Sequence, residues 1–162
     1  MKAHREFPVR SGGPEYPERE EHPHSDVTAS DGTEHKLEMA VVFTSPRRTV
    51  AALHLAAALM KGLDGRIALI YAQSIPYPLP LEKPPILIDF TRQRLHAISN
   101  VSTVGVTPHI VLCRFRFEAL VNILKPYSLI IIGCRKSRWP NWEKKLARKL
   151  KRSGYEVLVR EV

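Results

Sequence analysis

The sequence contains only two cysteines, Cys113 and Cys134. Two thiols cannot form the disulfide framework of a small secreted domain, and their spacing matches no metal-binding motif. Long hydrophobic runs are also lacking, because no apolar stretch approaches the roughly 20 residues that a membrane-spanning helix needs. The segment 1–35 is too polar and acidic for a signal peptide. We therefore expect a soluble, cytoplasmic protein without membrane contact.

Acidic residues are scarce, and they are unevenly distributed. The chain has 25 Lys and Arg against 16 Asp and Glu, which gives a net charge of +9. Five basic and eight acidic residues lie within 1–36, so the remaining 126 residues carry a net charge of +12. A region this basic favours anionic ligands, polyanions or acidic protein partners.

The segment 1–36 has scattered Pro and Gly, few apolar residues and no periodicity. It cannot bury enough apolar surface to offset the entropy of ordering it, so we expect a disordered polar tail. The spacing of its histidines defines no metal geometry, and we interpret them as solvated. They are His4, His22, His24 and His35.

From Leu37 onward, short apolar runs alternate with helical patterns. Strands are expected over 37–44, 66–73, 106–114, 127–134 and 155–162, and helices over 45–62, within 86–102, over 115–125 and over 141–152. Ser45 and Pro46 fit the N-cap and first position of the first helix. The alternation predicts one domain, 37–162, with a doubly wound, Rossmann-like, five-stranded parallel sheet and four helices.

A ligand of such a sheet binds beyond the carboxyl ends of the strands, where the strand order reverses. We expect this reversal between the first and fourth strands, so the candidate loops are 43–49 and 132–141. In the first loop, the Thr44 and Ser45 hydroxyls and the free N–H groups of a helix start could bind an anion near Arg47. The alternative is that Ser45 only caps its helix.

The second loop has a single glycine, Gly133, followed by long cationic side chains. A phosphate cradle of backbone amides needs several glycines, so this loop predicts anion contacts through side chains instead. The predicted nucleotide or anion site consists of Thr44, Ser45, Arg47, Gly133, Arg135, Lys136 and Ser137.

The opening "MAVVFTSPRRTVAALHLAAALMKGLDGRIALIYAQ" and the closing "KPYSLIIIGCRKS" to "YEVLVREV" resemble the universal stress protein family. The resemblance covers 37–162 and includes a hydrophobic run ending at Gly133. It implies a universal-stress-protein-like fold, a stress-associated or regulatory role, and a homodimer formed through the last strand.

ATP-binding members of that family carry an Asp after the first strand and a Gly-x2-Gly-x9-Gly-Ser/Thr loop after the fourth. Here Thr44 stands at the Asp position, and Lys136 replaces the second Gly. The last two positions fall on Leu146 and Ala147, or on Glu143 and Lys144 if the last strand is aligned. The resemblance therefore implies a degenerate nucleotide site without ATP binding in the family's manner.

Residues 135–152 contain nine Lys and Arg against one acid, Glu143. Trp142, Leu146 and Leu150 would form the apolar stripe that packs this helix on the sheet. Three interpretations stay open: a solvated face, a nucleic-acid or polyanion surface on which Trp139 stacks, and a surface for an acidic protein. The polyanion contacts would be Arg138, Lys144, Lys145, Arg148, Lys149, Lys151 and Arg152.

No pattern pairs a nucleophile with a base. His54, His96 and His109 are isolated in predicted helices and a strand, and the carboxylates form no catalytic pair. Cys134 lies beside the basic loop, which could lower its pKa, but we expect an unreactive thiol. We predict that the protein is not an enzyme.

Overall fold

A computed structural model describes residues 37–82, 88–139 and 141–162. The predicted tail 1–36 lies outside the described residues, as do the end of the Pro-rich loop and the predicted start of the second helix. The elements are β1 (Leu37–Val42), α1 (Pro46–Met60), β2 (Gly65–Ser74), α2 (Ile88–Ser99), β3 (Val106–Cys113), α3 (Arg116–Ile123), β4 (Leu129–Cys134), α4 (Trp142–Arg152) and β5 (Glu156–Glu161).

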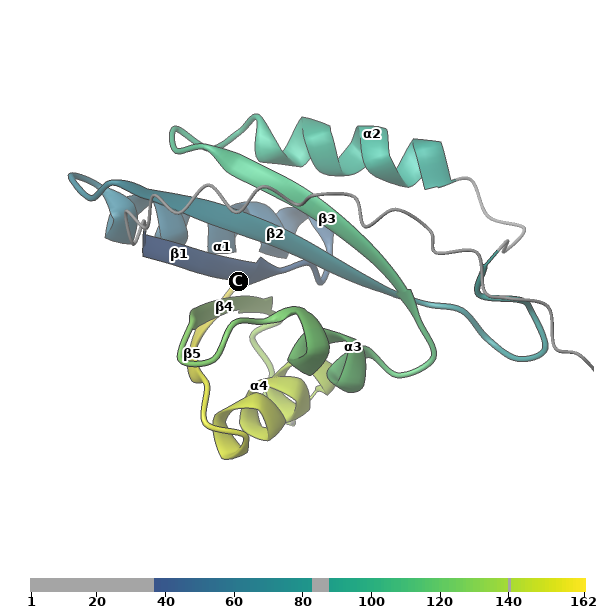
Figure 1. Cartoon of the computed structure of the whole chain (residues 1–162). Helices are drawn as coiled ribbons and strands as arrows, with labels where there is room; N and C mark the ends of the chain where they lie inside the picture. The colour runs from purple at the N-terminus through teal and green to yellow at the C-terminus, as the bar shows by residue number, and fades with distance from the viewer. Residues whose placement is uncertain (1–36, 83–87, 140) are drawn as a thin grey trace, which may run out of the picture. The chain divides into compact units, whose positions relative to one another are not determined.

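The five strands form one parallel sheet in the order β3-β2-β1-β4-β5. The chain winds outward from β1 through β2 to β3, then returns to the other side of β1 for β4 and β5 (Figure 1). The reversal of strand order therefore lies between β1 and β4. This confirms the predicted doubly wound fold and the predicted place of its switch point.

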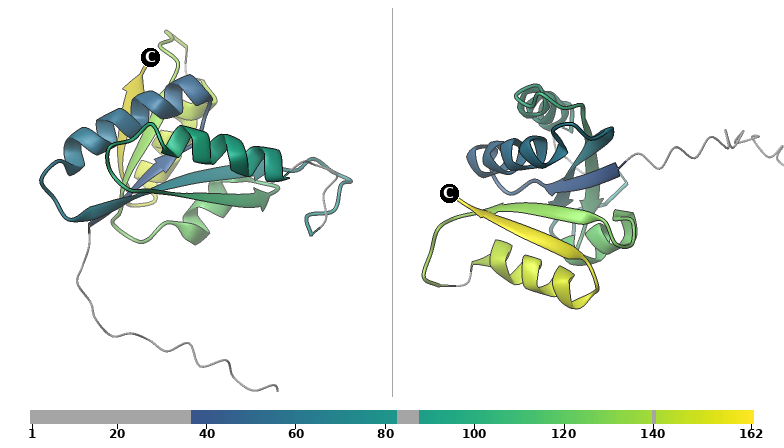
Figure 2. Two further views of the ribbon diagram at one scale, coloured as in Figure 1. Left: turned by 90° about the horizontal axis from the view of Figure 1, so that it is seen from above. Right: turned by 90° about the vertical axis from the view of Figure 1, so that its left-hand side faces the viewer.

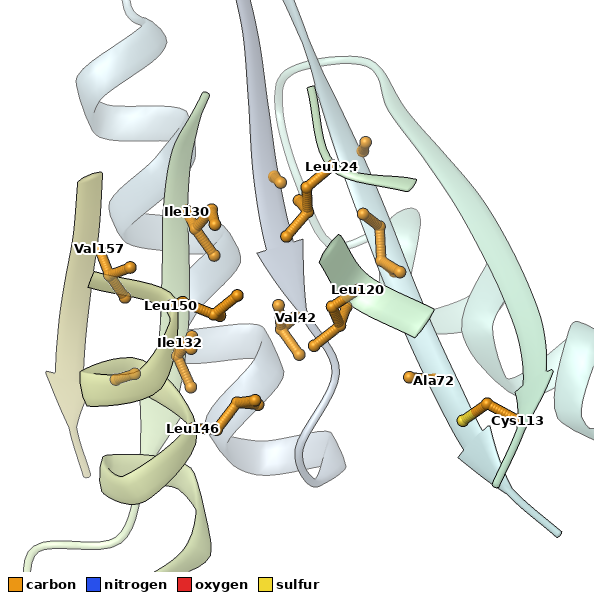
Figure 3. Close-up of a cluster of buried hydrophobic side chains, with 14 residues drawn as sticks. Val42, Ala72, Cys113, Leu120, Leu124, Ile130, Ile132, Leu146, Leu150 and Val157 are labelled. Atoms are coloured by element: carbon orange, nitrogen blue, oxygen red, sulfur yellow. The ribbon is translucent and has the colours of Figure 1, made fainter. Parts of the chain in front are cut away.

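Helices cover both faces of the sheet (Figure 2). On β1, Met39 and Val41 pack toward α1 and α2, whereas Ala40 and Val42 face α3 and α4. Figure 3 shows the second of these cores, where Leu120 of α3 and Leu150 of α4 meet the strand side chains. Strands covered on both faces read as continuous apolar runs, which is why their positions could be predicted.

The buried face of α1 differs in part from the prediction. The sequence indicated Val50, Leu53, Ala57 and Met60, but the buried residues are Thr49, Ala52, Leu53, Ala56 and Met60. Thr49 is fully buried, and its hydroxyl accepts a hydrogen bond from the Thr44 N–H at 3.2 Å. The buried face of α1 thus includes a polar residue that is bonded to the β1–α1 turn, which apolar spacing alone could not reveal.

Candidate functional site

The switch point brings Thr44 and Gly133 together, as predicted. The Thr44 hydroxyl donates to the Gly133 carbonyl oxygen at 2.7 Å. The Thr44 backbone N–H is bonded to Thr49, so both donors of Thr44 are used within the protein. The residue at the family's Asp position therefore ties β1 to β4.

Gly133 is needed because the first turn of α1 lies against it. A Cβ at position 133 would lie 2.2 Å from the Arg48 carbonyl oxygen and 2.7 Å from its carbonyl carbon. A Cβ atom essentially never lies this close to main-chain atoms to which it is not bonded. The glycine thus permits the close approach of a helix of the same chain.

The side chain of Arg48 also helps to close the switch point between β1 and β4. Its guanidinium donates to the carboxylate of Glu143, in the first turn of α4, and forms an ion pair with it. The Glu143 side chain is only 2% exposed, so Arg48 supplies the countercharge that this carboxylate requires. The positive charge of Arg48 is consequently used inside the fold, and a buried negative charge lies beside the switch point.

Ser45 and Arg47 stay at the surface of the α1 start. Ser45 is the N-cap residue, and its carbonyl accepts the Thr49 N–H at 2.8 Å, but its hydroxyl makes no capping hydrogen bond. Pro46 at the first helical position fixes the helix start instead. Arg47 is exposed and has no carboxylate partner among the described residues.

The loop after β4 uses its own backbone groups. The Lys136 N–H donates to the Val162 carbonyl at 3.1 Å, and the Val162 N–H donates to the Cys134 carbonyl at 3.0 Å. The side-chain amide of Asn141 donates to the Arg135 carbonyl at 3.2 Å. The Lys136 backbone N–H, a donor that a phosphate cradle would use, is therefore occupied by Val162, while the side chains of Arg135 and Lys136 are exposed.

Lys144 belongs to this loop rather than to an open cationic surface. Its ammonium donates to the Ser137 carbonyl at 3.0 Å and pairs with Glu161 at 2.6 Å, and the residue's side chain is 21% exposed. The hydrogen bond and the charge of Lys144 lower the pKa of the Glu161 carboxyl below its usual range. The predicted role of Lys144 as a polyanion contact is thus replaced by a structural one.

Cys134 is a buried free thiol. Burial raises its pKa, the nearby Glu161 raises it further, and these effects outweigh Lys144. The sequence argument for a lowered pKa is therefore wrong, because it considered the basic loop without the burial and the carboxylates. A thiol that stays protonated at neutral pH is a weak nucleophile, in accord with the unreactive thiol that we expect.

The outer side of α4 differs from this closed loop. The exposed cations Arg138, Lys145, Arg148, Lys149, Lys151 and Arg152 have no ion pair within the described part of the chain. Trp142, predicted to pack on the sheet, is 40% exposed, and the Arg116 guanidinium lies 4.7 Å from its ring centroid. The helix packs through Glu143, Leu146, Ala147 and Leu150 instead.

A hollow of about 480 Å³ lies at the opposite end of the sheet, where α3 ends. Its lining includes the strand residues Ala40, Ala68 and Ile70. The ammonium of Lys125 at this hollow is paired with Glu38, so it offers an anion no free countercharge. Local sequence patterns do not predict this hollow, because residues far apart in the chain form it.

The described residues contain no group of three His, Cys, Asp or Glu that could hold a metal ion. None of the described helices is both long and apolar enough to cross a membrane.

No protein-family model matches the sequence, and no curated protein matches it. Among solved structures, the chain is similar to a protein from the universal stress protein family from Burkholderia pseudomallei. The two share 20% sequence identity with a TM-score of 0.49, and the match covers 78% of this chain and 96% of that chain.

Proposed function

We propose that this chain is a non-catalytic regulatory domain of the universal stress protein type, acting in the cytoplasm, in which the nucleotide position has degenerated. The observation that carries the proposal is the placement of Arg48. Its main chain lies against Gly133, and its guanidinium is paired with Glu143. A phosphate entering here would have to displace helix backbone and would face a buried carboxylate.

The side chains able to do chemistry are also dispersed. His54, His96 and His109 are exposed, and none of their imidazole rings has a hydrogen-bond or ion-pair partner among the described residues. General-base catalysis needs a base within hydrogen-bond reach of its nucleophile. The isolation of these residues supports a binding or regulatory role.

A homodimer through β5 is part of this proposal. β5 is an edge strand with exposed apolar side chains, since Leu158 is 40% and Val159 38% exposed, and Val162, just after the strand, is 39% exposed. An exposed strand edge is a template for pairing with another chain. The resemblance to the family implies this pairing, and the stress-associated role has the same origin.

The test is a thermal unfolding series with Mg²⁺-ATP, paired with an assay of phosphate release. A ligand present at 100 times its Kd stabilises a folded protein by about 2.7 kcal/mol, which is readily seen in the Tm. We expect an unchanged Tm at millimolar ATP and no phosphate release. A rise in Tm that T44V abolishes would contradict the proposal, since T44V removes the Thr44 hydroxyl from the switch point.

A further inference from the structure

Four cations form one exposed stripe along α4. Lys145, Arg148, Lys149 and Arg152 follow the spacing i, i+3, i+4 and i+7, which places them on the same side of a helix. We call this stripe the α4 cationic face. No carboxylate of the described residues pairs with it, because Glu143 points to the buried side and is held by Arg48. Its positive charges therefore lack a countercharge within the described domain.

Aromatic rings accompany this charge at the start of α4. Trp142 is 40% exposed, and the Arg116 guanidinium of α3 lies over its ring. One turn before it, Trp139 is 82% exposed. Within the stripe, the Lys149 ammonium lies 3.9 Å from the ring centroid of Phe117 in α3. Helix α3 thus contributes a cation and a ring to the same surface.

We propose that the α4 cationic face, together with Trp142 and Arg116, binds single-stranded nucleic acid. Lysine and arginine side chains supply affinity for phosphates irrespective of sequence. An exposed indole offers a stacking platform for an unpaired base, whereas the bases of a duplex are already stacked on one another. A peptide of acidic residues could neutralise the charge but has no base to stack on Trp142.

The dimensions of the surface suit a short stretch of one strand. From Trp142 to Arg152, α4 rises roughly 15 Å, at about 1.5 Å per residue. The four cations along this length can neutralise about four phosphates of one strand. The surface includes neither Thr44 nor Gly133, so this proposal does not depend on the state of the switch point.

Fluorescence anisotropy with the full-length chain tests the proposal. The probes are labelled 15-nucleotide oligo-dT and oligo-rU, a labelled DNA hairpin duplex, and poly-glutamate as competitor, at 50 and 200 mM KCl. We expect both single strands to bind more tightly than the duplex, with a slope of log K against log salt of about −3 for about four neutralised phosphates. The dT and rU arms show whether DNA or RNA is preferred.

Two variants separate charge from stacking. The reversal K145E/R148E/R152E should weaken single-strand binding by at least about tenfold. Its matched control is K61E/R66E/R94E, which changes the net charge equally at exposed residues just after α1, in β2 and in α2. The control should lose far less affinity for single strands. W142L keeps an apolar side chain but removes the aromatic ring. It should lower the affinity for single strands by at least about fivefold and leave the affinity for inorganic polyphosphate unchanged.

Several results would overturn the proposal. They are no binding of either strand at 50 mM KCl, equal losses in the reversal variant and its control, unchanged single-strand affinity in W142L, or competition by poly-glutamate as strong as by unlabelled oligo-dT. The last result would assign the surface to an acidic protein. If circular dichroism shows that the reversal variant is unfolded, K145Q/R148Q/R152Q takes its place, with an expected loss of at least about threefold.

Discussion

Two groups of cations lie close together in this fold and differ in their surroundings. At the switch point, Arg48 and Lys144 are paired with Glu143 and Glu161, and both pairs hold neighbouring elements together. On the α4 cationic face, the cations have no acidic partner among the described residues. The number of charges does not distinguish the two groups. Their position in the fold distinguishes them. A cation directed toward the sheet pairs with a carboxylate and stabilises the fold, whereas a cation directed outward is available to bind a partner.

The largest effect should come from breaking the buried pair. R48M leaves Glu143 as an unpaired charge that is 2% exposed, so we expect a loss of about 3–5 kcal/mol in the free energy of unfolding. Urea denaturation measures this loss. The double variant R48M/E143L, which replaces the pair with apolar side chains, should recover most of the stability. A loss below about 1 kcal/mol in R48M would show that the pair contributes little to the closure.

A second test uses the contact of α1 with β4. G133A introduces a methyl group 2.2 Å from the Arg48 carbonyl oxygen, so main-chain atoms must move. Such overpacking costs about 1–3 kcal/mol, which urea denaturation resolves. G105A is the matched control, because a Cβ at Gly105 meets nothing within 4 Å. Equal stabilities of the two variants would contradict the view that Gly133 is needed for helix packing.

The α4 cationic face should show the opposite behaviour in the same assay. Exposed residues without partners usually change stability by no more than about 0.5 kcal/mol each. K145E/R148E/R152E should therefore unfold within about 1 kcal/mol of the wild-type protein, despite a change of six charge units. A loss as large as that of R48M would mean that these cations have a structural role after all.

The smallest effect concerns the pair of Lys144 and Glu161. Because the folded protein lowers the pKa of Glu161 below its ordinary value of 4.5, the pair stabilises the fold above that value, and the stabilisation is lost as pH falls through the folded pKa. E161Q should thus be less stable than wild type at pH 7, and the difference should shrink as the pH falls below 4.5 and vanish below the folded pKa of Glu161. Urea midpoints at pH 7, 5, 4 and 3 measure this change.

E156Q is the control for that series, since Glu156 lies in the same strand without an ion pair among the described residues. Its stability relative to wild type should vary much less with pH. A pH-independent difference for E161Q would show that its contact with Lys144 is not electrostatic.

Much of the fold could be predicted because its information is local. Apolar runs such as 129–132 mark buried strands, and Ser45 with Pro46 marks a helix start. The meeting of Thr44 and Gly133 also followed, because parallel strands place their carboxyl ends at one edge of the sheet.

The closure of the site could not be predicted from local patterns. The pair of Arg48 and Glu143 joins residues 95 positions apart, and the only signal was that Glu143 is the single acid in a basic helix. The orientation of α4 was also misjudged at Trp142, because an aromatic residue at helical spacing fits either the core or the edge of the buried face. The contact of its ring with Arg116, which lies in another helix, gave no local sign in the sequence.

The most direct measurement is a calorimetric titration of Mg²⁺-ATP into the wild-type protein and into K145E/R148E/R152E, which lacks the free cations of α4. We predict no saturable binding to the variant, because the switch point is closed by Arg48 and Glu143. Any weak, salt-sensitive heat with the wild-type protein should disappear in the variant. One-to-one binding of equal affinity in both proteins, abolished by T44V, would contradict this account and place a nucleotide between β1 and β4.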